Sequence, residues 1–148
     1  MANASDVKKL RELTGAGVMD AKNALTETGD DFEKAVEVIK QKGLAKADKK
    51  AEREIKAGLI KTYTHNDRVG VVLKVGCETD FVARSEPFKE LVHNLAVHIV
   101  AMDPANVDEL MAQPFVKDEG TSVEDLVKGV IAKTWENIKI DGFYRLEL

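Results

Sequence analysis

The chain has 148 residues, of which 44% are hydrophobic and 32% are charged, and its formal net charge is −4. This length fits one domain, or one domain with a small appended module. The acidic balance argues against a primary nucleic-acid binder, whose surface is usually basic. The single cysteine, Cys77, excludes a disulfide within the chain and so a secreted scaffold held by disulfides. No apolar run is long enough to span a membrane, and the first residues lack the apolar core of a signal peptide, so we expect a cytoplasmic protein.

The first 45 residues contain three segments with the apolar spacing of amphipathic helices. They cover residues 5–13, 18–27 and 31–42. The apolar positions expected on their inner faces are Val7, Leu10 and Leu13, then Val18, Ala21, Ala24 and Leu25, then Phe32, Ala35, Val36 and Ile39. Gly43 follows the third segment, and a glycine commonly ends a helix. Because three such helices can bury one small shared core, the sequence predicts a three-helix module over residues 1–45.

The next segment, residues 46–57, is charged and rich in alanine and is predicted to be a helical linker between two domains. Its lysines and arginine could in principle contact a nucleic acid. Acidic residues alternate with them, however, which weakens the attraction for phosphate and favours a solvated helix with pairs of opposite charge. We therefore expect no direct contact with nucleic acid.

From residue 58 the pattern changes to that of strands. Residues 58–65 and 69–77 are β-rich and flank a polar turn, which predicts an antiparallel hairpin. The remaining predicted elements are helices at 86–102, 106–112 and 123–137 and a last strand at 138–148. We expect this strand to complete a three-stranded antiparallel sheet with helices on one face. The fold class is therefore α+β, with a second domain at residues 58–148.

Residues that could carry catalysis or hold a metal are sparse. Cys77 has no histidine or aspartate at a spacing that indicates a nucleophile, and we interpret it as a half-buried strand cysteine. His93 and His98 are five residues apart on one predicted helix, whereas the zinc-binding spacing is four with a glutamate between. His93 is predicted at the surface and His98 partly buried. We expect no catalytic residue, no metal site and no cofactor.

Two places are better explained by contact with another protein. Thr79-Asp80-Phe81-Val82 stands at a strand-to-helix junction, where Phe81 either points into the core or projects to fill a pocket of a partner. Val18-Met19-Asp20-Ala21-Lys22 follows a glycine-rich turn, and the helical spacing directs Met19 and Lys22 toward solvent. An exposed methionine is an adaptable apolar contact.

Three stretches of the chain resemble the elongation factor Ts family. LRELTGAGVMDAKNAL resembles the N-terminal signature of that family, and CETDFVAR resembles its second signature, which also follows a strand. QPFVKDEGTSVEDLVKGVIAKTWENI resembles its C-terminal part. The resemblance extends over nearly the whole chain, and the three motifs in register are together very specific.

The resemblance implies a three-helix module similar to ubiquitin-associated domains, followed by an α+β core. It implies a non-enzymatic guanine nucleotide exchange factor of translation elongation that binds elongation factor Tu, both GDP-bound and nucleotide-free, and promotes release of GDP. In the family, the phenylalanine of the TDF motif enters between helices of the GTPase domain and disturbs its magnesium- and phosphate-binding elements. Carried over, Phe81 takes that role, with Thr79, Asp80 and Val82 beside it in the contact.

The same resemblance implies a second contact through the N-terminal module. There Val18 and Met19 would make apolar contact with another helix of the GTPase domain, and Lys22 would offer a charge to an acidic partner group.

The chain also departs from the family pattern. Short members usually carry a longer, charged helical insertion where this chain has only residues 102–113. Trp135 stands where a glycine is expected. Some relatives dimerise through the core sheet, one of them with a cysteine in the last strand; Tyr144 lies in that region here. A non-covalent homodimer stays open.

Two other hypotheses are compatible with the sequence. The first is a general interaction module, in which a head similar to ubiquitin-associated domains is joined to a chaperone-like core; it predicts binding to ubiquitin or unrelated peptides and none to Tu. The second is a cysteine-dependent activity at Cys77, which predicts a reactive thiol.

Overall fold

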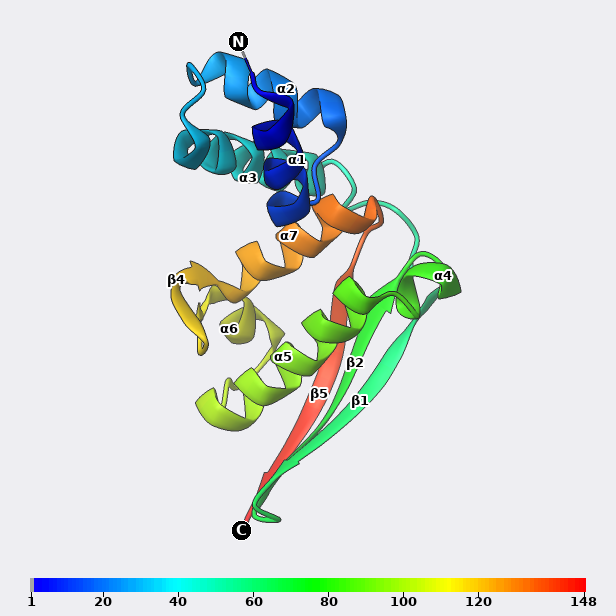
Figure 1. Cartoon of the computed structure of the whole chain (residues 1–148). Helices are drawn as coiled ribbons and strands as arrows, with labels where there is room; N and C mark the ends of the chain where they lie inside the picture. The colour runs from blue at the N-terminus through cyan, green and yellow to red at the C-terminus, as the bar shows by residue number, and fades with distance from the viewer. Residues whose placement is uncertain (1) are drawn as a thin grey trace.

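The computed structural model describes residues 2–148 and has the α+β architecture predicted from the sequence (Figure 1). Three helices form an N-terminal unit, here called the head, and the rest of the chain forms a sheet covered by helices on one face. The elements in chain order are α1 (Ala4–Thr14), α2 (Val18–Glu27), α3 (Phe32–Asp48), β1 (Ala57–His65), β2 (Val69–Cys77), α4 (Asp80–Ala83), α5 (Glu86–Met102), α6 (Val107–Ala112), β3 (Pro114–Phe115), β4 (Asp118–Ser122), α7 (Val123–Thr134) and β5 (Lys139–Glu147). Within residues 2–148, none of the helices combines the length and the apolar character needed to cross a membrane.

The head has a small aliphatic core of its own. Its fully buried members are Leu10, Ala21, Ala24, Leu25 and Ala35. Two residues predicted on the inner faces are instead exposed: Leu13 by 61% and Val18 by 50%. They lie near the end of α1 and at the start of α2, on either side of the turn that joins the two helices.

The third helix is longer than predicted. α3 continues through Gly43 to Asp48, so the expectation that Gly43 ends it was wrong. A Cβ atom at Gly43 would lie 3.1 Å from the Cβ of Ala132 in α7. The glycine therefore serves a close approach of two helices and not a helix end. Because Ala47 near the end of α3 belongs to the main core, the helix continues from the head onto the rest of the molecule. The division into domains at residues 45 and 58 stays a prediction.

The predicted three-stranded antiparallel sheet is confirmed, with the order β1-β2-β5. Ala57 pairs with Cys77 at one end of the hairpin and His65 with Val69 at the other. Asn66 and Asp67 both have left-handed backbone angles, with φ of 52° and 54°, as a tight hairpin turn requires and as Asn and Asp tolerate.

One face of this sheet supplies the main core. Val71, Leu73 and Val75 alternate along β2 with exposures of 3%, 0% and 0%, the period of two expected for a half-buried strand. Helix α5 lies across this face, and α7 packs between α5 and the head (Figure 1). The opposite face remains uncovered and carries exposed apolar side chains, namely Ile60, Val72, Tyr144 and Leu146.

Three further differences from the predictions concern α5 and the segments after it. A two-stranded ladder, β3–β4, precedes α7 and was not predicted. His98 of α5 binds the segment of this ladder, and its side chain is fully buried, not partly buried as predicted. The Nδ1 atom of His98 accepts a hydrogen bond from the Val116 amide at 3.1 Å, and its Nε2 atom lies 2.8 Å from the side-chain oxygen of Gln113. The α7 helix ends at Thr134, three residues before the predicted end, and Trp135 caps it with a left-handed φ of 65°.

Candidate protein-interaction site

The turn between β2 and α5, residues 78–84, is here called the corner. It contains α4, a helix of one turn that begins after Thr79. The Thr79 hydroxyl caps this helix by accepting a hydrogen bond from the Val82 amide at 3.3 Å, which is the usual role of threonine at a helix N-terminus. The corner therefore has a defined start, set by a side chain that the sequence had marked as part of the site.

The corner separates its side chains into an inner and an outer set. Val82 and Ala83 are 6% and 3% exposed and belong to the main core, whereas the ring of Phe81 is 87% exposed. Successive residues of a helix point about 100° apart, so burial of Val82 and Ala83 directs Phe81 outward. The prediction that this ring projects is confirmed in its geometry. Val82 lies inward, and this position argues against the direct partner contact expected for it.

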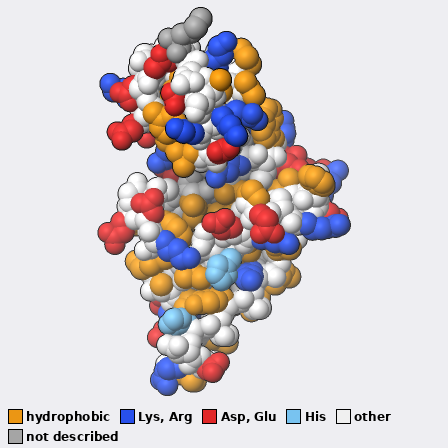
Figure 2. Space-filling model, viewed as in Figure 1, with side chains coloured by type: hydrophobic (Ala, Val, Ile, Leu, Met, Phe, Trp, Pro, Cys, Tyr) orange, Lys and Arg blue, Asp and Glu red, His pale blue; other side chains and the backbone are white. Residues whose placement is uncertain are grey.

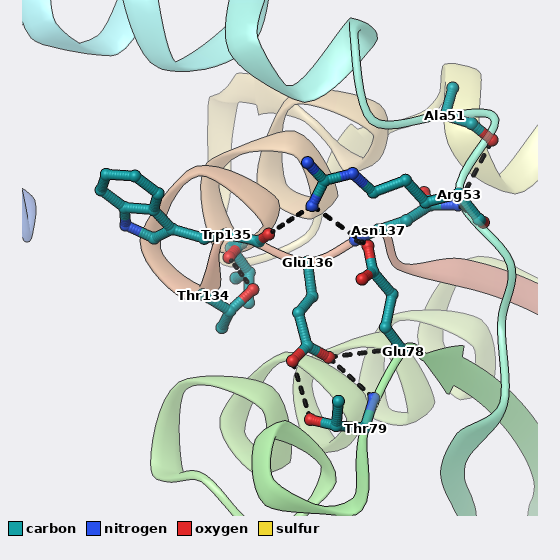
Figure 3. Close-up of polar contacts among 9 residues, drawn as sticks. Ala51, Arg53, Glu78, Thr79, Thr134, Trp135, Glu136 and Asn137 are labelled. Carbon is teal, nitrogen blue, oxygen red and sulfur yellow. Dashed lines mark hydrogen bonds and ion pairs between the residues drawn. The ribbon is translucent and has the colours of Figure 1, made fainter.

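Glu136, two residues after the end of α7, binds the corner (Figure 3). One carboxylate oxygen of Glu136 accepts hydrogen bonds from the amides of Glu78 and Thr79 at 3.1 and 2.9 Å. The other accepts the Thr79 hydroxyl proton at 2.7 Å. Charge-assisted bonds of this kind are stronger than neutral ones, so two backbone amides and one hydroxyl fix the chain just before Phe81.

Hydrogen bonds run in both directions between the corner and the segment after α7. The Glu78 carboxylate accepts a hydrogen bond from the Asn137 amide at 2.8 Å, so each loop offers a carboxylate to the backbone of the other. Asn137 is only 2% exposed, and its side-chain amide donates to the carbonyls of Ala51 and Arg53. The linker after α3, the corner and the start of β5 therefore meet at one polar junction, which Figure 3 displays.

The second predicted contact lies at the start of α2. Met19 is 63% exposed and Val18 is 50% exposed, and Lys22 lies on the same solvent-facing side. Val18 and Lys22 line a shallow groove between α1 and α2 together with Val7 and Arg11. The exposure of Met19 and Lys22 agrees with the sequence analysis, whereas Val18 is not a core residue of the head.

Helix α7 connects the two places. Its last turn lies against the α1–α2 turn, since a Cβ atom at Gly15 would be 3.1 Å from the Cγ atom of Lys133. Three residues further on, Glu136 binds the corner. The exposed residues of α2 and the exposed ring of Phe81 are therefore held relative to one another by one short stretch of chain, residues 133–136.

The chemical groups near the corner do not assemble a reactive site. Cys77 is completely buried, not half-buried as predicted, and burial raises the pKa of its thiol to about 11, with a further contribution from the Glu136 carboxylate. A thiol is nucleophilic as its thiolate, so Cys77 is held in its inert form at neutral pH. Among residues 2–148, no three His, Cys, Asp or Glu side chains are grouped so that they could hold a metal ion.

The surface charge gives no basic patch on the face drawn in Figure 2, where lysines and arginines are interspersed with acidic side chains. Several of these charges pair between elements. Lys46 of α3 contacts Asp20 of α2 at 3.4 Å, and Lys128 of α7 contacts Asp48 of α3 at 2.8 Å. Pairs at the surface contribute little each; the first joins two helices of the head, and the second connects the head to α7.

The fold defines an α+β protein with a three-helix head and a projecting aromatic corner. Comparison with known proteins identifies its family. The family model described as "Elongation factor TS" matches residues 78–148. A protein named elongation factor Ts from Fervidobacterium nodosum is 41% identical over 192 aligned positions, covering 99% of this chain and 98% of the relative. One from Pseudothermotoga lettingae is 46% identical over 188 positions, covering 96% and 95%. The chain belongs to the elongation factor Ts family.

These alignments also show how the chain differs from its relatives. The 192 aligned positions exceed the 148 residues of the chain, so the Fervidobacterium relative carries residues with no counterpart here. The relative from Aquifex aeolicus is 46% identical over 148 positions, which cover 96% of this chain but 51% of that protein. The chain is thus a short form of the family.

Proposed function

We propose that this chain is a guanine nucleotide exchange factor that binds elongation factor Tu and promotes release of its GDP during translation elongation. The observation that carries the proposal is the Phe81 ring, 87% exposed on a corner fixed by hydrogen bonds in a member of this family. Aromatic side chains often serve as the anchors of protein interfaces, and a ring presented on a fixed corner is placed to be one. Phe81 enters between helices of the GTPase domain of Tu and displaces the elements that hold magnesium and phosphate.

The energetics suit a non-catalytic mechanism. A factor accelerates release when it binds nucleotide-free Tu better than GDP-bound Tu, and by linkage GDP weakens binding of the factor to the same degree. Burial of one phenylalanine side chain is worth about 1.5–3 kcal/mol, and about 1.4 kcal/mol is a tenfold change in an equilibrium. Phe81 therefore supplies a large part of the coupling, and spread contacts supply the rest.

Other exposed residues complete the proposed interface. Asp80 is exposed beside Phe81, and Thr79 holds the corner as well as flanking the ring. Met19 and Val18 offer apolar contact at the head, and Lys22 pairs with an acidic group of Tu. The protein uses no cofactor and acts in the cytoplasm. A non-covalent homodimer through the uncovered face of the sheet is compatible with this arrangement.

The test is release of a fluorescent GDP analogue from Tu, followed after mixing with excess unlabelled GDP. The unmodified chain is expected to accelerate release, and Phe81→Ala is expected to lower that acceleration at least tenfold, because the ring supplies the coupling. Met102→Ala is a matched control, since Met102 is an exposed apolar residue, 44% exposed, at the opposite end of α5 from the corner.

Release that proceeds at the spontaneous rate with the unmodified chain present would end the proposal. Equal loss with Phe81→Ala and Met102→Ala would show that the ring has no special part. Binding to ubiquitin or unrelated peptides, with none to Tu, would favour the general interaction module instead.

A further inference from the structure

We propose that Glu136 is a positioning residue for nucleotide exchange, which holds the corner so that Phe81 is presented before the partner arrives. The inference rests on the proposed function and adds to it a residue outside the predicted contact. Glu136 lies 57 residues from Thr79 in the sequence, and its carboxylate points toward Glu78 and Thr79 of the corner (Figure 3).

Glu136 sets the direction of the Thr79 hydroxyl. A hydroxyl has one proton to donate, and here the proton goes to Glu136 at 2.7 Å. Its oxygen is therefore free to accept from the Val82 amide at 3.3 Å, which is the bond that starts α4. Without the carboxylate the hydroxyl can rotate, and the cap of a helix of only four residues loses its orientation.

Glu136 also fixes the backbone before α4. The amides of Glu78 and Thr79 both point to one oxygen of Glu136, at 3.1 and 2.9 Å. These amides immediately precede α4 and are not part of a sheet ladder, since β2 ends at Cys77. Glu136 is thus the acceptor that fixes this stretch of chain, and loss of it leaves the two amides to water.

The position of the corner determines how well Phe81 can act in nucleotide exchange. Apart from Glu136, the β2–α5 turn is held by the core contacts of Val82 and Ala83 and by the hydrogen bond from Asn137 to Glu78. If residues 78–81 move, only a fraction of the molecules presents the ring in the position that binds Tu. The apparent affinity of the protein for Tu then falls by that fraction. Preorganisation of this kind raises affinity without adding a contact. Glu136 therefore acts through Phe81.

The experiment compares Glu136→Ala and Glu136→Gln with Glu124→Ala as the control. Glu124 is an exposed carboxylate at the other end of α7, so its removal makes the same change of charge. Exchange is measured against Tu·GDP concentration. Glu136→Ala is expected to lower kcat/KM about tenfold, and Glu136→Gln is expected to recover part of this, because an amide oxygen still accepts from both backbone amides. Glu124→Ala is expected to change it less than twofold.

A double variant separates positioning from general loss of stability. If Glu136 acts through the ring, adding Glu136→Ala to Phe81→Ala is expected to cause less than a twofold further loss, since there is no ring left to position. Hydrogen exchange of the amides at residues 78–82 is expected to quicken in Glu136→Ala and to stay unchanged in Glu124→Ala. Thr79→Val, which keeps the shape but not the hydroxyl, is expected to reproduce part of the loss and serves if Glu136→Ala does not fold.

The outcomes distinguish the two proposals. Normal exchange by Glu136→Ala, or a loss that simply multiplies with that of Phe81→Ala, overturns the positioning role and leaves the proposed function intact. Failure of the unmodified chain to stimulate release overturns both.

Discussion

At the scale of single residues, two phenylalanines close together in the sequence take opposite positions. Phe88 is fully buried, whereas Phe81, seven residues earlier, is 87% exposed. Composition cannot distinguish two such phenylalanines. The distinction comes from α4, whose next two residues are drawn into the core and whose start is fixed by Thr79 and Glu136. The exposed ring is therefore a consequence of where the short helix begins.

Cys77 is a residue whose chemistry the fold suppresses. Burial raises the pKa of its thiol to about 11 from an ordinary 9.0. Between these values the unfolded chain loses the proton while the folded chain keeps it, so the stability that Cys77 contributes is complete below pH 9 and is lost as pH rises toward 11. At pH 10 the loss is about 1 kcal/mol.

This prediction is checked by urea unfolding of the unmodified chain and of Cys77→Ala at pH 8 and pH 10. Other groups that titrate in this range are common to both proteins and cancel in the difference. The stability gap between the two is expected to narrow at the higher pH. A gap of constant size would contradict the raised pKa and would reopen the cysteine-dependent activity as an alternative.

At the scale of elements, two glycines in helices have opposite roles. Gly43 in α3 faces Ala132 of α7 at 3.1 Å from where its Cβ would be, whereas a Cβ at Gly129 in α7 would meet nothing within 4 Å. Gly129→Ala is expected to stabilise the protein by about 0.5–1 kcal/mol, because glycine lowers helix stability by that amount. Gly43→Leu is expected to destabilise it by about 1–3 kcal/mol through overpacking of the helix crossing.

Thermal unfolding followed by circular dichroism measures both changes, and each variant serves as the control of the other. A rise in Tm for Gly129→Ala with a fall for Gly43→Leu is expected. A rise for Gly43→Leu would mean that α3 and α7 separate without cost, and the attachment of the head to α7 described here would then be wrong.

The elements themselves were largely predictable from the sequence, because most have a strong apolar period. The hairpin of β1 and β2, the long helix α5 and the last strand all lie where the pattern indicated. The errors have physical reasons. Gly43 was interpreted as a helix end because the helix that packs against it lies almost ninety residues later. The ladder of β3 and β4 was missed because β3 has only two residues, too few for a period.

The candidate site was predictable in part. Phe81, Met19 and Lys22 were expected at the surface and lie there. Glu136 was not identified, because a glutamate after a helix has no local signal and its partners lie 57 and 58 residues away. The inward position of Val82 also depends on contacts with the core that the motif alone does not specify.

At the scale of the whole molecule, α7 is the element that joins the parts. It packs on α5 and α3, and its last turn lies against the turn between α1 and α2 (Figure 1). Glu136, two residues after it, binds the corner. Lys128 adds an ion pair with Asp48 at 2.8 Å. The two places proposed to contact Tu are thus carried by one connected support, which favours simultaneous engagement at two points of the partner.

The central claim is that the ring of Phe81 makes the protein prefer nucleotide-free Tu over GDP-bound Tu. Calorimetric titration of both forms of Tu, with the unmodified chain and with Phe81→Ala, measures that preference directly. The unmodified chain is expected to bind nucleotide-free Tu more tightly, and the ratio of the two dissociation constants is expected to fall at least tenfold in Phe81→Ala. An unchanged ratio, with both affinities weakened equally, would contradict it, because the ring would then be an anchor alone and not the source of exchange.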